Sequence, residues 1–263
     1  MELVTREAIN DITEGWGHWE IWTTFAWMDI RKRYRGSILG PFWITLSMGI
    51  WVTAIGLIYS NLFKTSIQEY LPYLTVGVLV WTLISTLVSE SCAVFISSGG
   101  ILRQTPIPAS IFVFQTVLRN MIVFGHNVVI YVLILLVFPI NLTISALSVI
   151  PAVLIYAVLG IGLCFCLGPI SARYRDVPPI TQSMLQVVFF LTPIFWDPKI
   201  FTGRTAFFEW NPIYHLIRIT REPLLGDPVP FDSWLFVSGL VAVVGVLAVW
   251  LFARTKDRIV HWV

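Results

Sequence analysis

Few side chains of this sequence could do chemistry, and the most informative are amides and aromatic rings inside apolar stretches. Spacings of four and three residues place one such set on a single helix face: Gln182, Gln186, Phe189, Pro193 and Trp196. A weaker stripe, at steps of four, consists of Trp43, Ser47 and Trp51. Amides hydrogen-bond hydroxyl groups and aromatic rings stack on sugar rings, so such faces could line a pathway. Packing against a polar helix explains them equally well.

A run of basic residues follows a tryptophan-rich segment ahead of the first long apolar stretch. Trp16, Trp19 and Trp22 recur every three residues. An amphipathic helix of this composition is typical of the headgroup layer, where indole rings lie and cations face anionic lipid. It is either an anchor that fixes topology or an entrance that meets a phosphate-bearing lipid. The basic residues are Arg31, Lys32, Arg33 and Arg35.

Motifs for nucleotide or metal chemistry are absent from the sequence. It contains neither GxxxxGK[ST], which would cradle phosphates, nor HExxH, which would bind zinc. Cys92, Cys164 and Cys166 lie in apolar stretches without a CxxC spacing, and we interpret them as small hydrophobic residues. We therefore expect no cofactor in this chain.

The elements that must position these residues are membrane spans. Only 12% of the 263 residues are charged, about half of the roughly 25% typical of soluble domains. The mean hydropathy is +0.80, and five stretches lack Asp, Glu, Lys and Arg. One of these stretches, 120–172, is long enough for two crossings of about 20 residues. The sequence predicts an all-α integral membrane protein, one transmembrane domain over 1–263, with an amphipathic segment at 1–36. Six spans are expected near 39–60, 71–94, 112–138, 149–170, 179–196 and 233–253.

The distribution of basic residues predicts the orientation of these spans. An even number of spans places both termini on one side of the membrane. Of the 17 basic residues, 11 fall on that side and 5 on the other. Because cytoplasmic segments carry an excess of Lys and Arg, the termini are expected in the cytoplasm.

Two connecting segments carry patterns of their own. The segment Ser97–Pro108, after the second span, is either a connector or a knob that docks into a cytoplasmic partner. Between the fifth and sixth spans, Asp197–Asp232 contains an amphipathic helix with His215, Arg218 and Glu222 on its polar face. This helix is expected to rest on the outer leaflet or to fold back into the membrane.

Two further patterns concern packing inside the bilayer. Glu90 and Arg119 lie at matching depths of the second and third spans, and we expect an ion pair because isolated charges in hydrocarbon are costly. Gly160, Cys164 and Gly168 form a row of small residues on the fourth span, which favours close helix packing.

Four motifs in order along the chain resemble the membrane subunit of type-2 ABC exporters. The similarity covers nearly the whole chain and is greatest to the branch that exports O-antigen, capsule and teichoic-acid glycans. The motifs are Arg31–Trp43 at the first span, Arg173–Val177 after the fourth, Leu191–Phe195 closing the fifth, and Trp210–Arg218 in the outer loop.

This resemblance implies a homodimer in the bacterial inner membrane that works with two copies of a separate ATPase, where ATP and Mg²⁺ bind. A glycan on undecaprenyl diphosphate would cross at the dimer interface, between the first and fifth spans. The resemblance assigns coupling to the ATPase to Ser98, Gly100, Ile101, Leu102 and Arg103. It assigns an inner gate loop to Arg173, Arg175 and Asp176, and an outer gate to Trp210, Asn211, His215 and Arg218.

Three other functions remain open on the sequence. An ABC exporter of a drug or small lipid would use the same spans, with a less polar aromatic face. An ion channel or secondary transporter usually shows acidic residues deep in the membrane or inverted repeats, and the sequence shows neither. A structural membrane partner would have no transport path.

Overall fold

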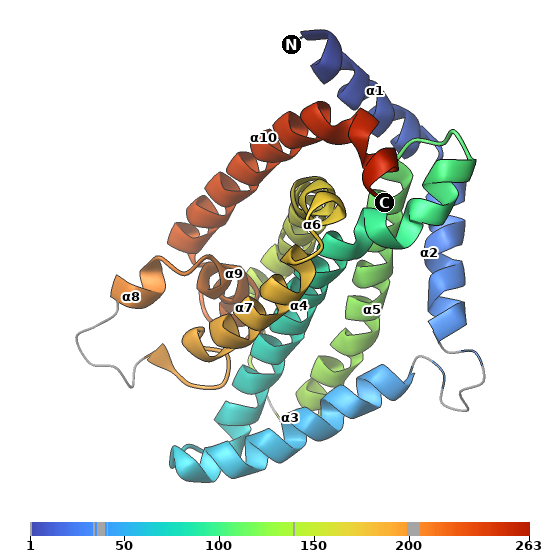
Figure 1. Ribbon diagram of the computed structural model, residues 1–263. Helices are drawn as coiled ribbons and strands as arrows, with labels where there is room; N and C mark the ends of the chain where they lie inside the picture. The colour runs from blue at the N-terminus through green and yellow to red at the C-terminus, as the bar shows by residue number, and fades with distance from the viewer. Residues whose placement is uncertain (1, 34, 36–39, 41, 139, 199–205) are drawn as a thin grey trace.

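All regular elements of the described residues are helices (Figure 1). The computed structural model describes residues 2–33, 35, 40, 42–138, 140–198 and 206–263. Parts of the predicted first span and of the 31–43 motif, and residues 199–205 of the outer loop, lie outside these ranges. The helices are α1 (Glu2–Gly17), α2 (Trp19–Arg33), α3 (Phe42–Leu62), α4 (Ile67–Gln104), α5 (Ser110–Val137), the 3-10 helix η1 (Ile144–Ser148), α6 (Val149–Arg173), α7 (Val177–Leu191), α8 (Ala206–Glu209), α9 (Pro212–Leu224) and α10 (Phe231–Trp262).

Five helical stretches are long and apolar enough to cross a bilayer. They are Thr45–Leu62, Ile67–Gln104, Ser110–Val137, Ile144–Arg173 and Phe231–Trp262, and each contains most of a predicted span. The predicted span at 179–196 corresponds to α7, which has only 15 residues. A straight crossing of about 30 Å needs roughly 20 residues, so α7 alone is too short for one.

Proline decides where α7 and α4 end. Thr192 and Thr105, the residues after these helices, are both extended, with ψ of 137° and 128°. Each precedes a proline, whose ring disfavours helical geometry in the residue before it. The prediction that a helix continues to residue 196 is therefore wrong, and so is the prediction of a loop beginning at Ser97.

The helical end of α4 is stabilised where the sequence suggests a loop. The hydroxyls of Ser97 and Ser98 donate to the carbonyls of Ala93 and Val94, at 2.9 and 2.8 Å. Gly99 packs so closely on Val263 that an added Cβ would lie 2.9 Å from its side chain. Tertiary packing thus outweighs the low helix propensity of glycine. With 38 residues, α4 is about 57 Å long and exceeds a hydrocarbon core of about 30 Å.

The N-terminal segment forms two helices, separated at His18, rather than one interfacial helix. Figure 1 shows α2 beside the first part of α5, while α1 lies near the end of α10. The ring of Trp16 lies 5.6 Å from that of Trp22 and 5.3 Å from that of Phe114 on α5. Lys256 of α10 donates to the carbonyl of Glu7 at 3.1 Å, so both termini lie at one end of the bundle. We call this the terminal end.

The row of small residues on α6 packs against α4, as predicted. A Cβ added at Gly160 would lie 2.9 Å from Leu87, and one added at Gly168 would lie 2.7 Å from Val94. Between them, the sulfur of Cys164 lies 3.2 Å from the hydroxyl of Ser91. The close approach of α4 and α6, together with α10 on the other side of α6, forms the core of the bundle.

Gly168→Ala should destabilise the protein by about 1–3 kcal/mol, because its Cβ would overlap the side chains of Val94 and Phe95. Gly125→Ala is the matched control, since nothing lies within 4 Å of its Cβ position. Thermal unfolding in detergent compares the two variants. Equal melting temperatures for both would contradict the packing of α6 on α4.

Candidate functional site

The two aromatic stripes predicted from the sequence lie on α3 and α7, and one contact between aromatic rings connects them. Their exposed members are Trp43, Ser47, Trp51, Gln182 and Gln186. The ring of Trp51 lies 6.5 Å from that of Phe189, edge to face. Trp43 and Trp51 are 55% and 41% exposed, although large aromatic side chains are usually well buried. This exposed aromatic–amide face is not covered by the described part of the chain.

Trp196 and Pro193 do not belong to this face, because α7 ends at Leu191. The Trp196 ring packs instead against Phe208, at 5.0 Å. Its indole N–H donates to the carbonyl of Phe190 at 3.4 Å. Phe189 is half-buried against Trp81 of α4, with the ring centres 5.4 Å apart. The predicted stripe is therefore correct for its first three members and wrong for its last two.

The bend after α7, Pro193–Trp196, is held by hydrogen bonds to its backbone carbonyls. On α4, the Tyr70 hydroxyl donates to the carbonyl of Phe195 at 2.5 Å, and the Tyr73 hydroxyl donates to that of Trp196 at 3.0 Å. Arg221 of α9 donates to the carbonyls of Pro193 and Ile194, at 2.7 and 2.9 Å. Three helices thus meet at this bend, at the end of the bundle opposite the termini.

Arg221 is the residue of this cluster that the sequence analysis missed. Its side chain is only 6% exposed, and its guanidinium carbon lies 3.9 Å from the centre of the Tyr73 ring. Burial lowers the pKa of Arg221, while Tyr73 and Asp197 oppose the shift. Gly77 leaves the space for the guanidinium, since an added Cβ would lie 1.9 Å from Nη2. Arg221 follows Ile213 and Ile217 at steps of four, and a charge on that apolar face is the signal that could have found it.

The predicted outer-gate residues lie along α9 and its N-terminus. The side chain of Asn211 accepts from the backbone N–H of Ile213 at 3.0 Å and so caps the helix. His215 is buried between the Ser233 hydroxyl, 2.9 Å from Nδ1, and the Glu209 carbonyl, 2.8 Å from Nε2. Arg218 forms ion pairs with Glu222 and Asp232, whereas Trp210 is 81% exposed. The predicted helix is confirmed, and it is folded back against α4 and α10.

Nearer the terminal end, the predicted ion pair of Glu90 and Arg119 is part of a larger network. Arg119 Nη2 lies 2.8 Å from Glu90, and its Nη1 contacts Asp29 of α2. Arg33, also on α2, pairs with the other oxygen of Glu90 at 3.2 Å. The amides of Asn120 and Gln115 donate to Glu90 and Asp29, at 2.6 and 2.7 Å. The network ties α2 to both α4 and α5.

The four predicted headgroup cations therefore divide into two groups. All four are exposed, but Arg33 forms an ion pair with Glu90, whereas Arg31, Lys32 and Arg35 form none with any described residue. The second group remains available to an anion outside the protein.

The predicted coupling residues form the last turns of α4, at the tip of the α4–α5 hairpin. Leu102 is buried and Ser98 half-buried, while Gly100, Ile101 and Arg103 are exposed. Below this tip, the carboxylate of Asp11 accepts from the backbone N–H groups of Ala109 and Ser110, at 3.2 and 3.0 Å. Asp11 thereby caps α5 and fixes α1 to the hairpin.

The predicted gate loop is tied to the C-terminus. Arg175 donates to the carbonyl of Trp262 at 3.0 Å, and the Arg173 guanidinium lies 5.4 Å from the Trp262 ring. Asp176 precedes α7 without capping it through its side chain. One end of α7 is therefore linked to α10 and the other to α9.

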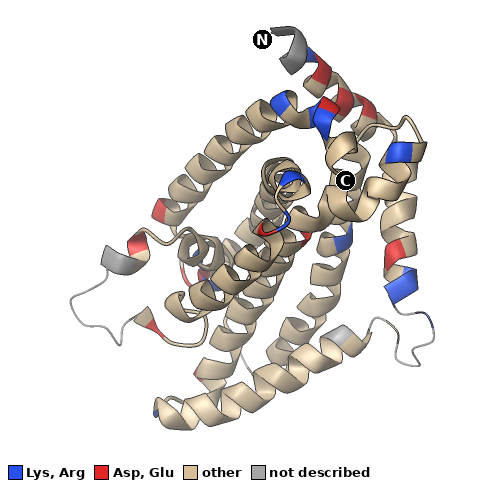
Figure 2. Cartoon of the chain, viewed as in Figure 1, with Lys and Arg blue, Asp and Glu red and all other residues tan. Residues whose placement is uncertain are grey.

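The described residues hold no group of three His, Cys, Asp or Glu side chains that could bind a metal ion. Figure 2 shows the charged residues mainly around α1, α2 and the helix ends, with long uncharged stretches between them. Such a bundle, with apolar spans and polar ends, defines a multi-pass membrane protein.

Comparison with known proteins identifies the family. The family model described as ABC-2 type transporter matches residues 21–225, and the chain belongs to this family. The chain is also similar to the "O-antigen export system permease protein RfbA" of Myxococcus xanthus, with 23% identity over 217 residues. That alignment covers 80% of this chain and 84% of the relative. Members of the family are transport subunits rather than catalytic ones.

Arg119→Ala should lower the free energy of unfolding by up to about 3–5 kcal/mol. It leaves Asp29 with only the Gln115 amide and Glu90 with only Arg33 and Asn120, in a poorly solvated place. Arg33→Ala, in the same network but with a side chain 48% exposed, should cost about 1 kcal/mol or less. Unfolding in detergent measures both changes. A larger loss for Arg33→Ala would contradict the geometry of the network.

Arg221→Met should loosen the Pro193–Trp196 bend, because the carbonyls of Pro193 and Ile194 lose the guanidinium donor. We expect backbone amides of residues 190–196 to exchange about tenfold faster or more with deuterium. Arg258→Met, which removes an exposed arginine of α10, is the control. Unchanged exchange at 190–196 would show that Arg221 does not hold the bend.

Proposed function

We propose that this chain is the membrane subunit of an ATP-driven exporter of polysaccharide linked to undecaprenyl diphosphate, such as O-antigen or a similar surface glycan. Two copies of the chain and two copies of an ABC ATPase form the exporter in the bacterial inner membrane. Both termini face the cytoplasm. Membership of the ABC-2 type transporter family supports the ATPase partnership, and the O-antigen export relative supports the glycan.

The exposed aromatic–amide face is the observation that carries this proposal. An amide that faces lipid is costly because its hydrogen-bonding groups find no partner there. A second copy placed against α3 and α7 would enclose Gln182 and Gln186 in a polar path instead. Trp43 and Trp51 would then offer flat rings on which successive sugars stack weakly, so that a long polymer can slide.

The shape of the terminal end supports coupling to a soluble ATPase. The α4–α5 hairpin is longer than a bilayer is thick, and its tip exposes Ile101 and Arg103. An apolar side chain beside a cation suits a docking contact. Since α1 and α2 are fixed to the same hairpin, movement of the tip would be passed to Glu90 and Arg119.

The exposed cations Arg31, Lys32 and Arg35 would meet the diphosphate of the lipid carrier where it enters. Binding and hydrolysis of ATP in the partner would then alternate the two copies between states with different affinity at the two ends. Movement of α9 and the Pro193–Trp196 bend would open the outer mouth.

The test is the double variant Trp51→Ala with Phe189→Ala, which removes the paired rings of the two helices. Surface glycan on intact cells should fall several-fold, while the chain still purifies as a dimer with its ATPase. The control is Leu235→Ala with Val246→Ala, which removes two exposed apolar side chains from α10.

Normal glycan export by a well-folded Trp51/Phe189 variant would contradict the proposed path. If no protein with an ATP-binding motif accompanies the wild-type chain, the proposed coupling at Ile101 and Arg103 fails as well.

A further inference from the structure

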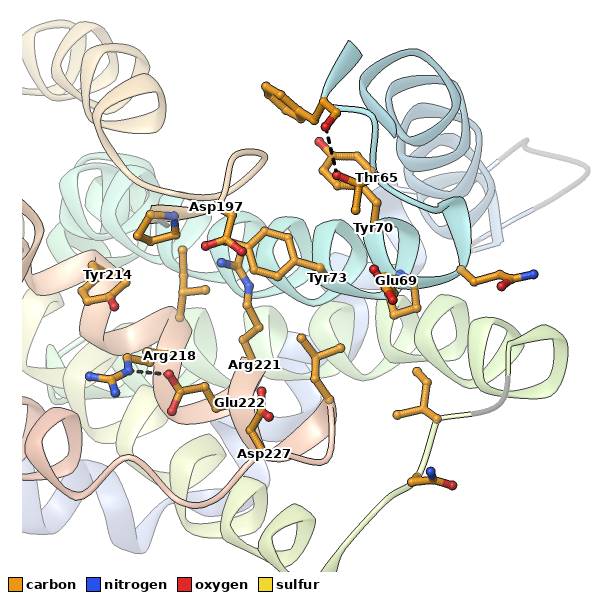
Figure 3. A pocket seen from close by; sticks show the side chains of 18 of the residues that line it. Thr65, Glu69, Tyr70, Tyr73, Asp197, Tyr214, Arg218, Arg221, Glu222 and Asp227 are labelled. Carbon is orange, nitrogen blue, oxygen red and sulfur yellow. Dashed lines mark hydrogen bonds and ion pairs between the residues drawn. The ribbon is translucent and has the colours of Figure 1, made fainter. Parts of the chain in front are cut away.

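A cavity of about 1160 Å³ opens at the end of the bundle opposite the termini (Figure 3). Its walls come from the α3–α4 connection, from α9, and from residues 140–141 and 225–227. It is separate from the aromatic–amide face, since no residue of that face lines it. Figure 3 shows Tyr73, Arg221 and Glu222 around its centre.

Hydrogen bonds and close packing hold the wall of the cavity in a fixed shape. Tyr70 and Tyr73 are fixed through their hydroxyls to the Pro193–Trp196 bend. On the opposite wall, the carbonyl of Asn141 lies so close to Gly226 that an added Cβ would be only 2.4 Å away. Gly226 also has a φ of +91°, which an L side chain rarely adopts.

Charge and hydrogen-bonding capacity in the cavity favour a ligand that donates hydrogen bonds. Four carboxylates line it, against two guanidinium groups. Both guanidinium groups are already engaged, Arg218 by Glu222 and Asp232 and Arg221 by two carbonyls. The carboxylates of Glu69 and Asp227 make no hydrogen bond or ion pair to any residue within the described ranges. Both residues are exposed, and an ionised carboxylate only accepts hydrogen bonds, so a ligand that replaces water at them must donate.

One hydroxyl in the wall can also meet a ligand. Arg221 offers it nothing further, because this side chain is 6% exposed and its unpartnered Nε is enclosed within the protein. The hydroxyl of Tyr214, two turns before Arg221 on α9, has no hydrogen-bond partner within the described ranges. The cavity thus offers acceptors and donors around partly apolar walls that include Ile217 and Leu225.

We propose that this cavity binds a short neutral saccharide segment of the exported glycan through Glu69, Asp227 and Tyr214. The inference rests on the proposed function and adds a binding site at the outer mouth of each copy. Sugar hydroxyls both donate and accept, and sugar rings have apolar faces for the aliphatic walls. The volume exceeds that of most small-molecule pockets, so more than one sugar unit fits.

The same features argue against other ligands. The excess of carboxylates repels phosphate groups, anionic phospholipid headgroups and acidic sugars. A metal ion would need a cluster of ligands, and the part of the chain that the structure describes holds no group of three candidate side chains.

The test measures binding with the chain purified together with its ATPase in lipid nanodiscs. The probes are tri- to hexasaccharides cut from the surface polysaccharide of the host strain. Saturation-transfer NMR should detect their binding, and Glu69→Gln with Asp227→Asn should weaken it by about tenfold or more. Tyr214→Phe should weaken it less. Glu20→Gln with Asp257→Asn, two exposed carboxylates outside the cavity, is the matched control.

Oligogalacturonate and a short-chain phosphatidylglycerol serve as competitors. Neither should displace the saccharide, and displacement by either would overturn the proposed selectivity for a neutral saccharide. Equal saccharide binding by wild type and the Glu69/Asp227 variant would overturn the site. Surface glycan on cells separates this inference from the proposed function: if the wild-type chain supports export and only the binding result is negative, the cavity proposal alone fails.

Discussion

The structure depends on one constraint: a charge enclosed by apolar helices needs polar or charged partners. Arg221 and Arg119 satisfy it in different ways. Arg221 is surrounded by backbone carbonyls and a tyrosine ring, whereas Arg119 is placed between two carboxylates. Because breaking either arrangement leaves polar groups unsatisfied, each holds several helices in a defined position. The two clusters are the fixed points from which the other contacts follow.

The helix α7 is only weakly anchored to the rest of the chain. None of its residues is buried within the chain. Its first end is connected through Arg175 to the C-terminus, and its last end continues into the bend that Arg221 holds. A displacement at either end is therefore carried to Gln182, Gln186 and Phe189 with few side-chain contacts to oppose it. In the proposed exporter, this connection lets ATP-driven movement at the cytoplasmic end change the path and the outer mouth together.

The sequence was most informative where a single physical rule applied. Apolar length predicted six spans, five of which are long helices, and the row Gly160, Cys164 and Gly168 predicted close packing, because both are local properties. The pair of Glu90 and Arg119 followed from depth alone. Asp29 and Arg33 could not be assigned to the same network, since their contacts depend on how α2 docks on α5.

The wrong predictions from the sequence also have physical reasons. Pro193 disfavours helical geometry at Thr192, and this is evident from the sequence alone. The helical spacing of the residues from Gln182 to Trp196 nevertheless suggests one continuous helix. The sequence alone does not predict that α4 continues through two serines and two glycines, because this continuation depends on the contact of Gly99 with Val263. The charge on the apolar face of α9 could have drawn attention to Arg221, but its carbonyl partners lie in a segment distant in sequence. The sequence predicts which residue types lie on the exposed faces of α3 and α7. Only the three-dimensional structure shows that no other described part of the chain covers them.

The most direct measurement places a photo-crosslinking amino acid at Gln186 of α7 in cells that synthesise the glycan. A matched position is Val246, exposed on α10. If α3 and α7 line the path, illumination should attach glycan to the chain at position 186 and not at 246, and the adduct should disappear when the ATPase is inactive. A glycan adduct at 246 alone, or none at 186 while export proceeds, would contradict the account.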